Sequence, residues 1–377
     1  MRVASLSVLL LLIGSTAVAQ AQLTVTAVNK LKTGRQSETI ELAAEKLAPL
    51  GEKDLMKIHV RDGAGKEVLA QAVDTDYDDY HKPDMLIFQA DFGPSETKTF
   101  TLAAGATREY SKEDFRAYGR FVRERFDDFA WENDRIAHRT YGKALITWKG
   151  EPLTSSAIDI WSKRTSKLVI NDWYMVDNYH ADHGEGVDAY SAGPTRGCGG
   201  SGIWSNGQLY IPTNFVDSRV LANGPIRVMF ELVYEPFDVN GVKVSQVLRV
   251  SLDAGSQLDR FRVSSQGGES LALAVGLKKV KEEQKDFNQA RGWLTIWEPV
   301  EKNLGMQGLA VVADPSTVDK LAEDKLNHLV VLKPGATTYW AGFAWDRAGQ
   351  ITSAESWKAY VDQFAERLRS PIDISIK

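Results

Sequence analysis

The sequence predicts a mainly β protein: a large antiparallel β-sandwich that carries one amphipathic helix near its C-terminus. Short runs that alternate apolar and polar residues recur along the chain, such as MKIHVRD at 56–62 and RVMFELVYE at 227–235. This period of two is typical of strands that bury one face, and turn residues between the runs favour antiparallel pairing. Further runs of this kind lie at 242–252, 258–265, 271–277, 308–314, 328–332 and 337–346.

Two hairpin turns and one helix can be placed from local signals. VNG at 239–241 and SNG at 205–207 predict tight turns, because Asn-Gly adopts the backbone that two-residue hairpin loops require. Thr352 and Glu355 suit a capping box in front of SWKAYVDQFAERLR. The apolar residues of this segment share one stripe, so we expect the helix to cover the outside of a sheet and to end before Pro371. They are Trp357, Tyr360, Val361, Phe364 and Leu368.

Three segments are predicted along the chain. Residues 1–19 have the pattern of a signal peptide, with Arg2, an apolar run and the small residues Ala17-Val18-Ala19. Residues 20–110 form an N-terminal β region, either part of the sandwich or a small subdomain, and residues 111–377 form the main sandwich that carries the site. We therefore expect an exported protein, periplasmic or secreted, without a membrane span.

The composition narrows the class of partner. The net charge is −5, and no basic block appears, so nucleic acid is a poor candidate. The single cysteine, Cys198, cannot form an internal disulfide. Ten tryptophans fit either a large sandwich core or platforms for sugar rings. A carbohydrate substrate is the partner we expect, and the oligomeric state stays open.

Two polar segments are the candidates for a functional site. They are DDFAWENDRIAHRTYG at 127–142 and the glycine-interrupted stretch at 172–190, and together they hold three of the six histidines. Loops laid over a rigid sheet are common positions for binding and catalytic groups. Acid–base work on a sugar needs a proton donor and a proton acceptor, which both segments supply.

The residue types suit β-elimination next to a uronate. This reaction needs a cation for the substrate carboxylate, a base for the C5 proton and an acid for the leaving oxygen. Arg135 and Arg139 are the predicted carboxylate clamps, and His180 and His183 the predicted bases. The remaining candidates are Tyr141 and Tyr179 as acids, Glu185 as a further catalytic group, and Trp131, Asn133, Trp173 and Tyr174 as substrate contacts.

Other functions stay open. A mutarotase or epimerase needs one base and one acid, for which a histidine and Glu185 suffice. A glycoside hydrolase needs a carboxylate pair, such as Glu132 with Asp182 or Asp134 with Glu185. A glycan-binding protein without catalysis is the third alternative.

Several of these residues also have plain structural explanations. Arg135 and Arg139 could be ion-paired with neighbouring acids, and His138 fits a buried structural histidine. No cofactor is required for the predicted chemistry. A divalent cation on His180, His183 and Glu185, or on Asp182, Glu185 and Asp188, is the alternative.

The motifs resemble a known family. FAWENDRIAHRTYG at 129–142, the stretch from DWY to GCGGSGIW at 172–204, and the C-terminal segment at 339–372 are similar to the secreted bacterial family DUF4861. The resemblance covers nearly all of the mature chain. It implies a supersandwich like that of galactose mutarotase and an association with the breakdown of uronic-acid polysaccharides.

Overall fold

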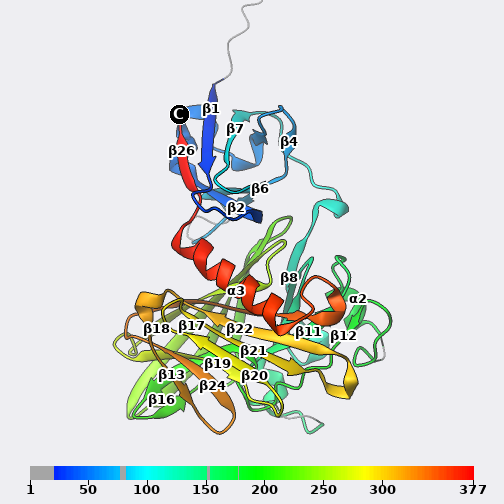
Figure 1. Ribbon diagram of the computed structural model, residues 1–377, viewed down its shortest axis with the longest axis vertical. Coiled ribbons are helices and arrows are strands. Elements are labelled where there is room, and N and C mark those ends of the chain that lie inside the picture. Colours follow the sequence, from blue (N-terminus) through cyan, green and yellow to red (C-terminus); the bar gives the residue numbers. More distant parts are fainter. Residues whose placement is uncertain (1–20, 77–81, 151–152, 177) are drawn as a thin grey trace, which may run out of the picture.

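The computed structural model describes residues 21–76, 82–150, 153–176 and 178–377. It confirms the predicted mainly β architecture, with antiparallel sheets and one long helix near the C-terminus. Figure 1 shows a narrow upper part and a wide lower part, with that helix between them. The predicted signal peptide lies outside the described residues. Within the described ranges, no helix combines the length and the apolar character needed to cross a bilayer.

Two small sheets form the upper part and enclose a core of their own, which includes Val25, Ile40 and Phe88. The last strand of the chain returns to this part and pairs with the first, so that Val25 lies opposite Ile376. No pattern in the sequence predicted this pairing. The first sheet has the order β26–β1–β7–β3–β4, with β1 (Gln22–Val28), β3 (Ile58–Arg61), β4 (Glu67–Val68), β7 (Thr97–Ala104) and β26 (Asp373–Ile376). The second has the order β2–β6–β5, with β2 (Arg35–Ala43), β5 (Ala70–Val73) and β6 (Met85–Phe92).

An eight-stranded antiparallel sheet is the main layer of the lower part. The predicted VNG turn joins its two longest strands, and Asn240 and Gly241 have the positive φ angles that this turn needs. The order is β15–β16–β17–β18–β25–β22–β21–β20. The bounds are β15 (Asp217–Asn223), β16 (Arg227–Val239), β17 (Val242–Asp253), β18 (Leu258–Gln266), β20 (Gln284–Asn288), β21 (Trp293–Pro299), β22 (Met306–Val312) and β25 (Thr338–Trp345).

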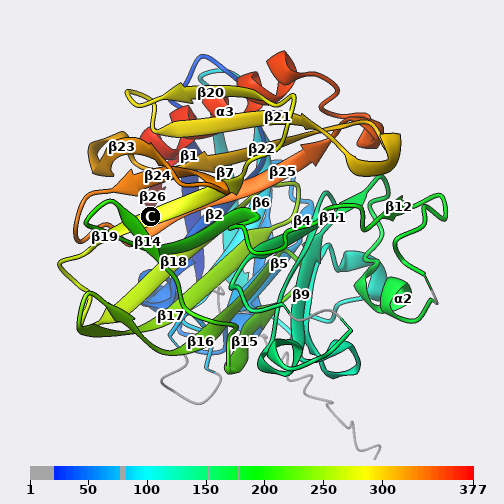
Figure 2. The ribbon, with the colours of Figure 1, turned by 90° about the horizontal axis from the view of Figure 1, so that it is seen from below.

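Two five-stranded sheets form the opposite layer, and the largest apolar core lies between them and the eight-stranded sheet. Figure 2 shows the strands of both layers from below. One sheet has the order β12–β11–β10–β9–β8, with β8 (Ala117–Val122), β9 (Asp128–Asn133), β10 (Ala137–Thr140), β11 (Ile158–Lys163) and β12 (Gly186–Val187). The other has the order β14–β13–β19–β24–β23, with β13 (Cys198–Ser205), β14 (Gln208–Tyr210), β19 (Ala272–Lys278), β23 (Val318–Glu323) and β24 (Asn327–Leu332).

The glycine-rich run GCGGSG at 197–202 is largely strand β13 rather than a loop. Gly199 has a φ of +97°, and a Cβ atom there would lie 2.3 Å from the Cβ of Ala341 in the facing sheet. Glycine therefore lets the two layers approach at this point. The predicted SNG turn follows β13, again with positive φ at Asn206 and Gly207.

The long helix α3 (Ala354–Arg369) covers the outer face of the eight-stranded sheet, against β21 and β22. Trp357 and Val361 are buried there, and the Trp357 indole N–H donates to the Leu309 carbonyl at 3.0 Å. The predicted capping pair was wrong by one position. Ser353 is the N-cap and pairs with Ser356, because Thr352 lies one residue too early to reach the first free N–H groups.

Short helices fill the connections between strands. The helix α2 lies next to the candidate site, and the others turn the chain at the ends of strands. Their bounds are α1 (Ala44–Leu47), η1 (Ala48–Leu50), η2 (Leu55–Lys57), η3 (Lys112–Asp114), η4 (Arg123–Arg125), η5 (Lys143–Ile146), α2 (Ile170–Tyr174), η6 (Glu301–Asn303), η7 (Pro315–Thr317) and η8 (Asp346–Ala348).

Replacing Trp357 by Ala tests how much the packing of α3 stabilises the sandwich. The substitution empties a buried site between α3 and β22, so we expect a loss of about 3–5 kcal/mol in the free energy of unfolding. Denaturant titration followed by circular dichroism measures it. Gln363→Ala, on the exposed face of the same helix, is the control and should change stability by less than about 0.5 kcal/mol. Equal effects of the two variants would contradict the packing argument.

Candidate functional site

A buried arginine with three carboxylates around it forms the centre of the candidate site. Arg139 on β10 lies directly opposite Asp159 on β11 in the strand register. Its Nε donates to Asp159 Oδ2 at 2.8 Å, and its Nη2 lies 3.0 Å from Asp188 Oδ2. Asp128 Oδ2, on the neighbouring β9, is 3.9 Å from Nη1. These four side chains are at most 6% exposed.

Three carboxylates and one guanidinium would bury an excess of negative charge, which is costly in a poorly solvated interior. Burial raises the pKa of Asp188 to about 8, and the nearby charge of Asp159 acts in the same direction, whereas Arg139 and Arg125 lower it. Asp188 is therefore mainly protonated at neutral pH. Burial opposes the charge of Arg139, yet Asp188 and Asp159 hold its pKa above the ordinary value, so the guanidinium stays charged.

Two tyrosines contact this centre, and they differ in how far solvent can reach their hydroxyl groups. The Tyr141 hydroxyl donates to Asp159 Oδ2 at 2.8 Å, and the residue is only 2% exposed. Burial, together with Asp159, raises its pKa well above the ordinary value. The Tyr179 hydroxyl accepts from Arg139 Nη1 at 3.2 Å, and its side chain is only partly buried. A substrate can therefore reach Tyr179, whereas Tyr141 belongs to the buried network.

His180 covers this centre from the solvent side. Its Nδ1 lies 3.1 Å from the Asp188 carbonyl and 3.3 Å from Asp188 Oδ2, while 48% of the side chain is exposed. If Nδ1 carries the proton and donates to that carbonyl, Nε2 is the acceptor nitrogen. Burial lowers the pKa of His180, and the positive charges of Arg139, Arg125 and Lys302 lower it further. The imidazole is neutral at pH 7 and can accept a proton.

An aromatic cluster packs against Tyr179, which in turn contacts His180. Trp161 on β11 stacks on Trp173, with ring centroids 5.5 Å apart, and also contacts Tyr174 and Tyr179. Trp173 and Tyr174 come from α2, whose first N–H groups donate to the buried carboxylate of Glu132. Trp173 is 8% exposed. The rings predicted to contact substrate thus mainly pack against one another and fix the position of Tyr179.

The loop that carries His183 and Glu185 is held by surface ion pairs. Asp182 forms a salt bridge with Arg164, and Glu185 Oε1 lies 2.7 Å from Lys167 Nζ. His183 Nε2 bonds to the Asn178 carbonyl at 2.9 Å. His183 and Glu185 therefore anchor the loop, and the structure does not bring them to Arg139 as it brings His180.

Three of the predicted polar-segment residues are core residues. Trp131 is fully buried, stacks on His138 and donates to Asp259 Oδ1 at 2.7 Å. Asn133 is also fully buried, and its amide holds the 253–256 turn through the carbonyls of Asp253 and Ser256. Their burial leaves Trp131 and Asn133 without a surface for substrate. His138 bridges the Asp159 carbonyl and Asp259, as expected of a structural histidine.

Arg135 and Arg139 do not act together. Arg135 lies in the turn between β9 and β10 and lines a different region, a cleft of about 1050 Å³ between the upper and lower parts. We call it the waist cleft; it is bounded by β2, residues 251–260 and α3. Both arginines were predicted as carboxylate clamps, but Arg139 lies on the strand β10 and Arg135 in the hairpin turn before it, so the two side chains lie in different regions.

The structure shows where the predicted cation ligands lie. Among the described residues, no group of three His, Cys, Asp or Glu side chains is arranged to hold a metal ion. The carboxylates of Asp128, Asp159 and Asp188 do lie close together, but the guanidinium of Arg139 occupies the space between them. His183 and Glu185, two of the proposed ligands, point to their own loop partners.

Some residues of the centre were missed by sequence reasoning. Asp128 and Asp159 were not predicted, although Asp159 stands between Ile158 and Ile160 in a strand that is buried throughout. A lone acid inside an apolar strand is a usable signal, because a buried carboxylate requires a partner. Trp161 and Arg125 gave no signal, since their contacts come from other strands and loops.

The chain belongs to the family described as domain of unknown function DUF4861, whose model matches residues 28–374. The resemblance seen in the sequence is thereby confirmed. Uncharacterized protein P7 of Formosa agariphila is 33% identical over 372 residues, which cover 94% of this chain and 93% of that protein. A solved structure of a protein in glycosyl hydrolase family 38 from Enterococcus faecalis has a TM-score of 0.52 and 12% identity. That alignment covers 94% of this chain but 47% of the other, and it shows the fold alone.

Asp188→Asn tests the protonation of the buried centre. The pKa of Asp188 in the fold, about 8, is above the unfolded value of about 3.9. The proton therefore stabilises the fold fully below about pH 4, and this contribution is lost as the pH rises through about 8. We expect the stability of the natural chain to fall relative to Asp188→Asn between about pH 5 and pH 9 in urea titrations.

Glu132→Gln provides the contrast. Glu132 accepts from Lys163 Nζ at 2.8 Å in a fully buried pair, so its neutral replacement should cost about 3–5 kcal/mol across the same pH range. A stability difference between Asp188→Asn and the natural chain that does not change with pH would contradict the assigned proton.

Proposed function

We propose that the chain is an exported carbohydrate-active enzyme that cleaves uronic-acid-containing glycans by β-elimination. The observation that carries this proposal is the pairing of His180 with Tyr179 over the buried Arg139. The neutral imidazole supplies a base, and the adjacent hydroxyl, held by Arg139 Nη1 at 3.2 Å, supplies an acid. No cofactor is needed for this step.

The reaction follows from these positions. His180 Nε2 takes the C5 proton of the uronate, and the electrons of the C5–H bond form the C4–C5 double bond. The C4–O bond breaks, and the leaving oxygen receives the Tyr179 proton. The positive charges of Arg125 and Lys302, which already lower the pKa of His180, favour the substrate carboxylate and the negative charge that develops on it. Arg139 positions Tyr179 rather than binding the carboxylate.

The burial of the carboxylates favours elimination over hydrolysis. A glycosidase needs two carboxyl groups that both reach the sugar. Asp128 and Asp159 are fully buried, and so is Glu132, whose two oxygens are taken by Lys163 and the start of α2. Asp134 binds the Gly255 N–H, while Asp182 and Glu185 hold their loop through ion pairs. These contacts leave neither predicted carboxylate pair available.

Carbohydrate is the first substrate class to test for a second reason. The solved structure that shares the fold is described as a member of a glycosyl hydrolase family. The choice of a uronic acid rests on the site itself, because the positive charges of Arg139, Arg125 and Lys302 all act on His180.

Ultraviolet absorbance of the mature chain mixed with uronic-acid polysaccharides tests the proposal. A rising signal from a 4,5-unsaturated uronate is expected. Loss of His180 removes the base, so His180→Ala should lower kcat at least about 100-fold, and Tyr179→Phe should do the same by removing the acid. His183→Ala is the matched control and should keep most of the activity, since its ring binds the loop backbone.

A flat absorbance trace on every substrate would reject the elimination. Proton NMR of the same mixtures then separates the alternatives, because a mutarotase or epimerase changes anomeric signals without cleavage, and a hydrolase forms new reducing ends. Saturable binding without any product would indicate a glycan-binding protein. Loss of activity when EDTA is added would support the alternative in which a divalent cation is bound at the site.

The pH dependence gives a second test. The pKa of His180 is lowered, so kcat/KM should rise with pH through a value below about 6.5 as the imidazole becomes neutral. Ionisation of Asp188 at about pH 8 adds a negative charge 3.3 Å from His180 Nδ1 and opposes an anionic substrate, so kcat/KM should fall again. Asp188→Asn should remove the alkaline fall and keep the acid limb. An unchanged alkaline limb in this variant would contradict the assignment.

A further inference from the structure

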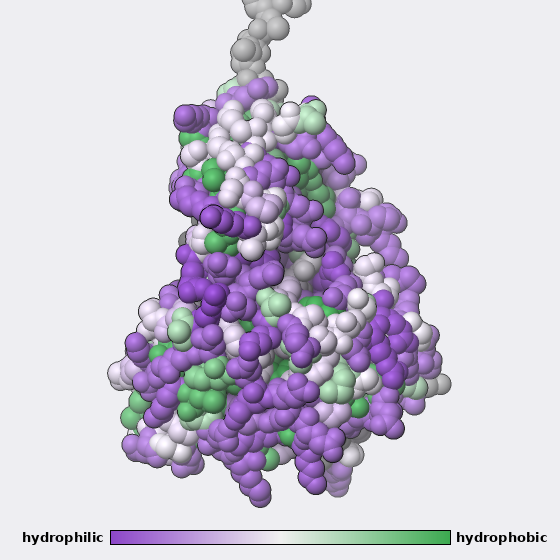
Figure 3. Space-filling model, viewed as in Figure 1, coloured by the Kyte–Doolittle hydropathy of each residue, from purple (hydrophilic) through white to green (hydrophobic). Residues whose placement is uncertain are grey.

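The waist cleft has a volume of about 1050 Å³, and its lining does not include His180. It lies between β2 of the upper part, the outer face of the eight-stranded sheet and α3. In the space-filling view the molecule narrows at this level, and hydrophilic side chains surround the narrow part (Figure 3). A volume of about 1050 Å³ is enough for several sugar rings.

Some arginines of the waist cleft have structural partners. Arg35 donates to Asn29 Oδ1 and lies 3.2 Å from Glu38 Oε1. Arg227 lies 2.6 Å from Glu41 Oε1 and 2.5 Å from Asp253 Oδ1. The Arg227–Glu41 pair connects the lower part to β2 of the upper part, whereas the other contacts lie within one part. Both arginines therefore have structural roles.

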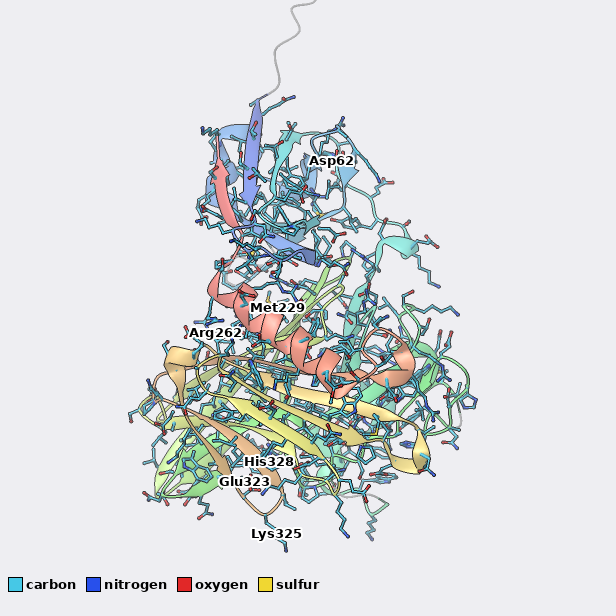
Figure 4. The ribbon with its side chains drawn as sticks, viewed as in Figure 1. Asp62, Met229, Arg262, Glu323, Lys325 and His328 are labelled. Carbon is cyan, nitrogen blue, oxygen red and sulfur yellow. The ribbon has the colours of Figure 1, made fainter. Side chains whose placement is uncertain are left out.

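Two other arginines have no such partner. Arg260 on β18 and Arg135 in the β9–β10 turn both line the cleft, and neither makes an ion pair within the described part of the chain. Burial is the main cause that lowers the pKa of Arg260; Glu41 and Asp253 raise it, whereas Arg227 and Arg262 lower it, and the net shift is downward. Arg262 lies two residues along β18 and is labelled beside α3 in Figure 4. Glu41 and Asp253 are paired with Arg227, so an anion in the cleft would give the partly buried Arg260 guanidinium a partner of its own.

Aromatic rings lie next to Arg260. Trp340 is opposite Arg260 in the β18–β25 register, and the guanidinium carbon is 6.0 Å from the centre of the indole. Phe364 of α3 contacts Trp340 edge to face, with centroids 6.4 Å apart, and Tyr360 stacks on Phe364. All three rings are partly exposed. Rings of this kind pack on the C–H faces of sugars.

An unsatisfied polar atom also lies in the lining. Gln257 is 6% exposed, and its side-chain Oε1 has no hydrogen-bond partner within the described part of the chain. A buried acceptor without a donor is costly, and a hydroxyl group in the cleft would satisfy it. This need is independent of the charges on Arg260 and Arg135.

We propose that the waist cleft is a second, non-catalytic binding site for an acidic saccharide, with Arg260 and Arg135 as anion contacts and Trp340 as the ring platform. The choice of a saccharide rests on the proposed function, whereas the requirement for an anion and a planar apolar contact comes from the cleft alone. The anion is a carboxylate or a sulfate ester, since both accept two parallel hydrogen bonds from a guanidinium. A polymer held here stays attached while a different segment of it reaches His180.

Calorimetric titration of the full mature chain tests this site. The probes are oligogalacturonate, a sulfated dextran oligosaccharide and neutral dextran of equal length. We expect at least one acidic probe to bind and the neutral probe not to bind, and the acidic probe that binds identifies the anion. Arg260→Gln combined with Arg135→Gln should weaken binding about tenfold or more, and Trp340→Ala should do so separately.

Lys325→Gln is the matched control. It removes one positive charge from an exposed position that Figure 4 places on the far side of the lower part, so binding should not change. Arg260→Lys keeps the charge but loses the planar fork and should weaken binding less than the glutamine variant. Circular dichroism and a melting curve establish that each variant is folded. Equal binding by the natural chain and by all folded cleft variants would overturn the proposal, as would binding of neither acidic probe.

The catalytic site and the waist cleft can fail separately. His180→Ala should keep acidic-oligosaccharide binding while losing cleavage, whereas the cleft variants should raise KM for long substrates and keep kcat on short ones. If no substrate is ever cleaved but the cleft variants lose binding, the proposed elimination is wrong and the binding site stands. If His180→Ala loses binding to the same extent as the cleft variants, the saccharide binds at His180 and the second site is wrong.

Discussion

The buried guanidinium of Arg139 is the interaction on which the candidate site depends. It connects two neighbouring strands through Asp128 and Asp159, and it connects them to Asp188, which follows β12. Since a buried charge without its partners costs several kcal/mol, the three chain segments are forced into one arrangement. The Tyr179 hydroxyl and the Asp188 backbone that contacts His180 are fixed by the same arrangement. The reactive groups are thus positioned by charge in the interior.

The β9–β10 hairpin connects the two regions to which function is assigned here. Arg139 lies within β10 in the buried centre, and Arg135 lies at the turn, in the waist cleft. Asn133 fastens this turn to the 253–256 turn of the eight-stranded sheet, and Asp134 holds the Gly255 N–H. The hairpin is therefore attached at both ends, so the distance between the turn at Arg135 and the buried centre at Arg139 is fixed by the fold.

The positions of most strands could be predicted from the sequence, whereas the pairing of the strands in sheets could not. The run at 227–235 alternates apolar and polar residues because one face is buried, and this pattern survives in any register. The pairing of β26 with β1 could not be predicted, since four residues at the end of the chain carry too little pattern. The capping box failed by one position because Thr352, Ser353 and Ser356 all have hydroxyls that can cap. His180, Tyr179 and Arg139 were predicted from their residue types. The sequence did not show that His183 would be held away from them by its loop contacts, or that Arg135 would lie in a hairpin turn.

The choice of Asp188 as the protonated member follows from its hydrogen bonds. Asp159 receives the Arg139 Nε, the Tyr141 hydroxyl and the Ile160 N–H, so both of its oxygens are satisfied. Asp188 Oδ2 has the Arg139 charge nearby but no well-aligned hydrogen bond. Burial is the largest cause that raises the pKa of Asp188, and the Trp161 indole opposes it only in part. The donors around Asp159 stabilise its charged form. The proton therefore resides on the carboxyl nearest His180, and the charge balance of the interior determines how much negative charge lies beside His180.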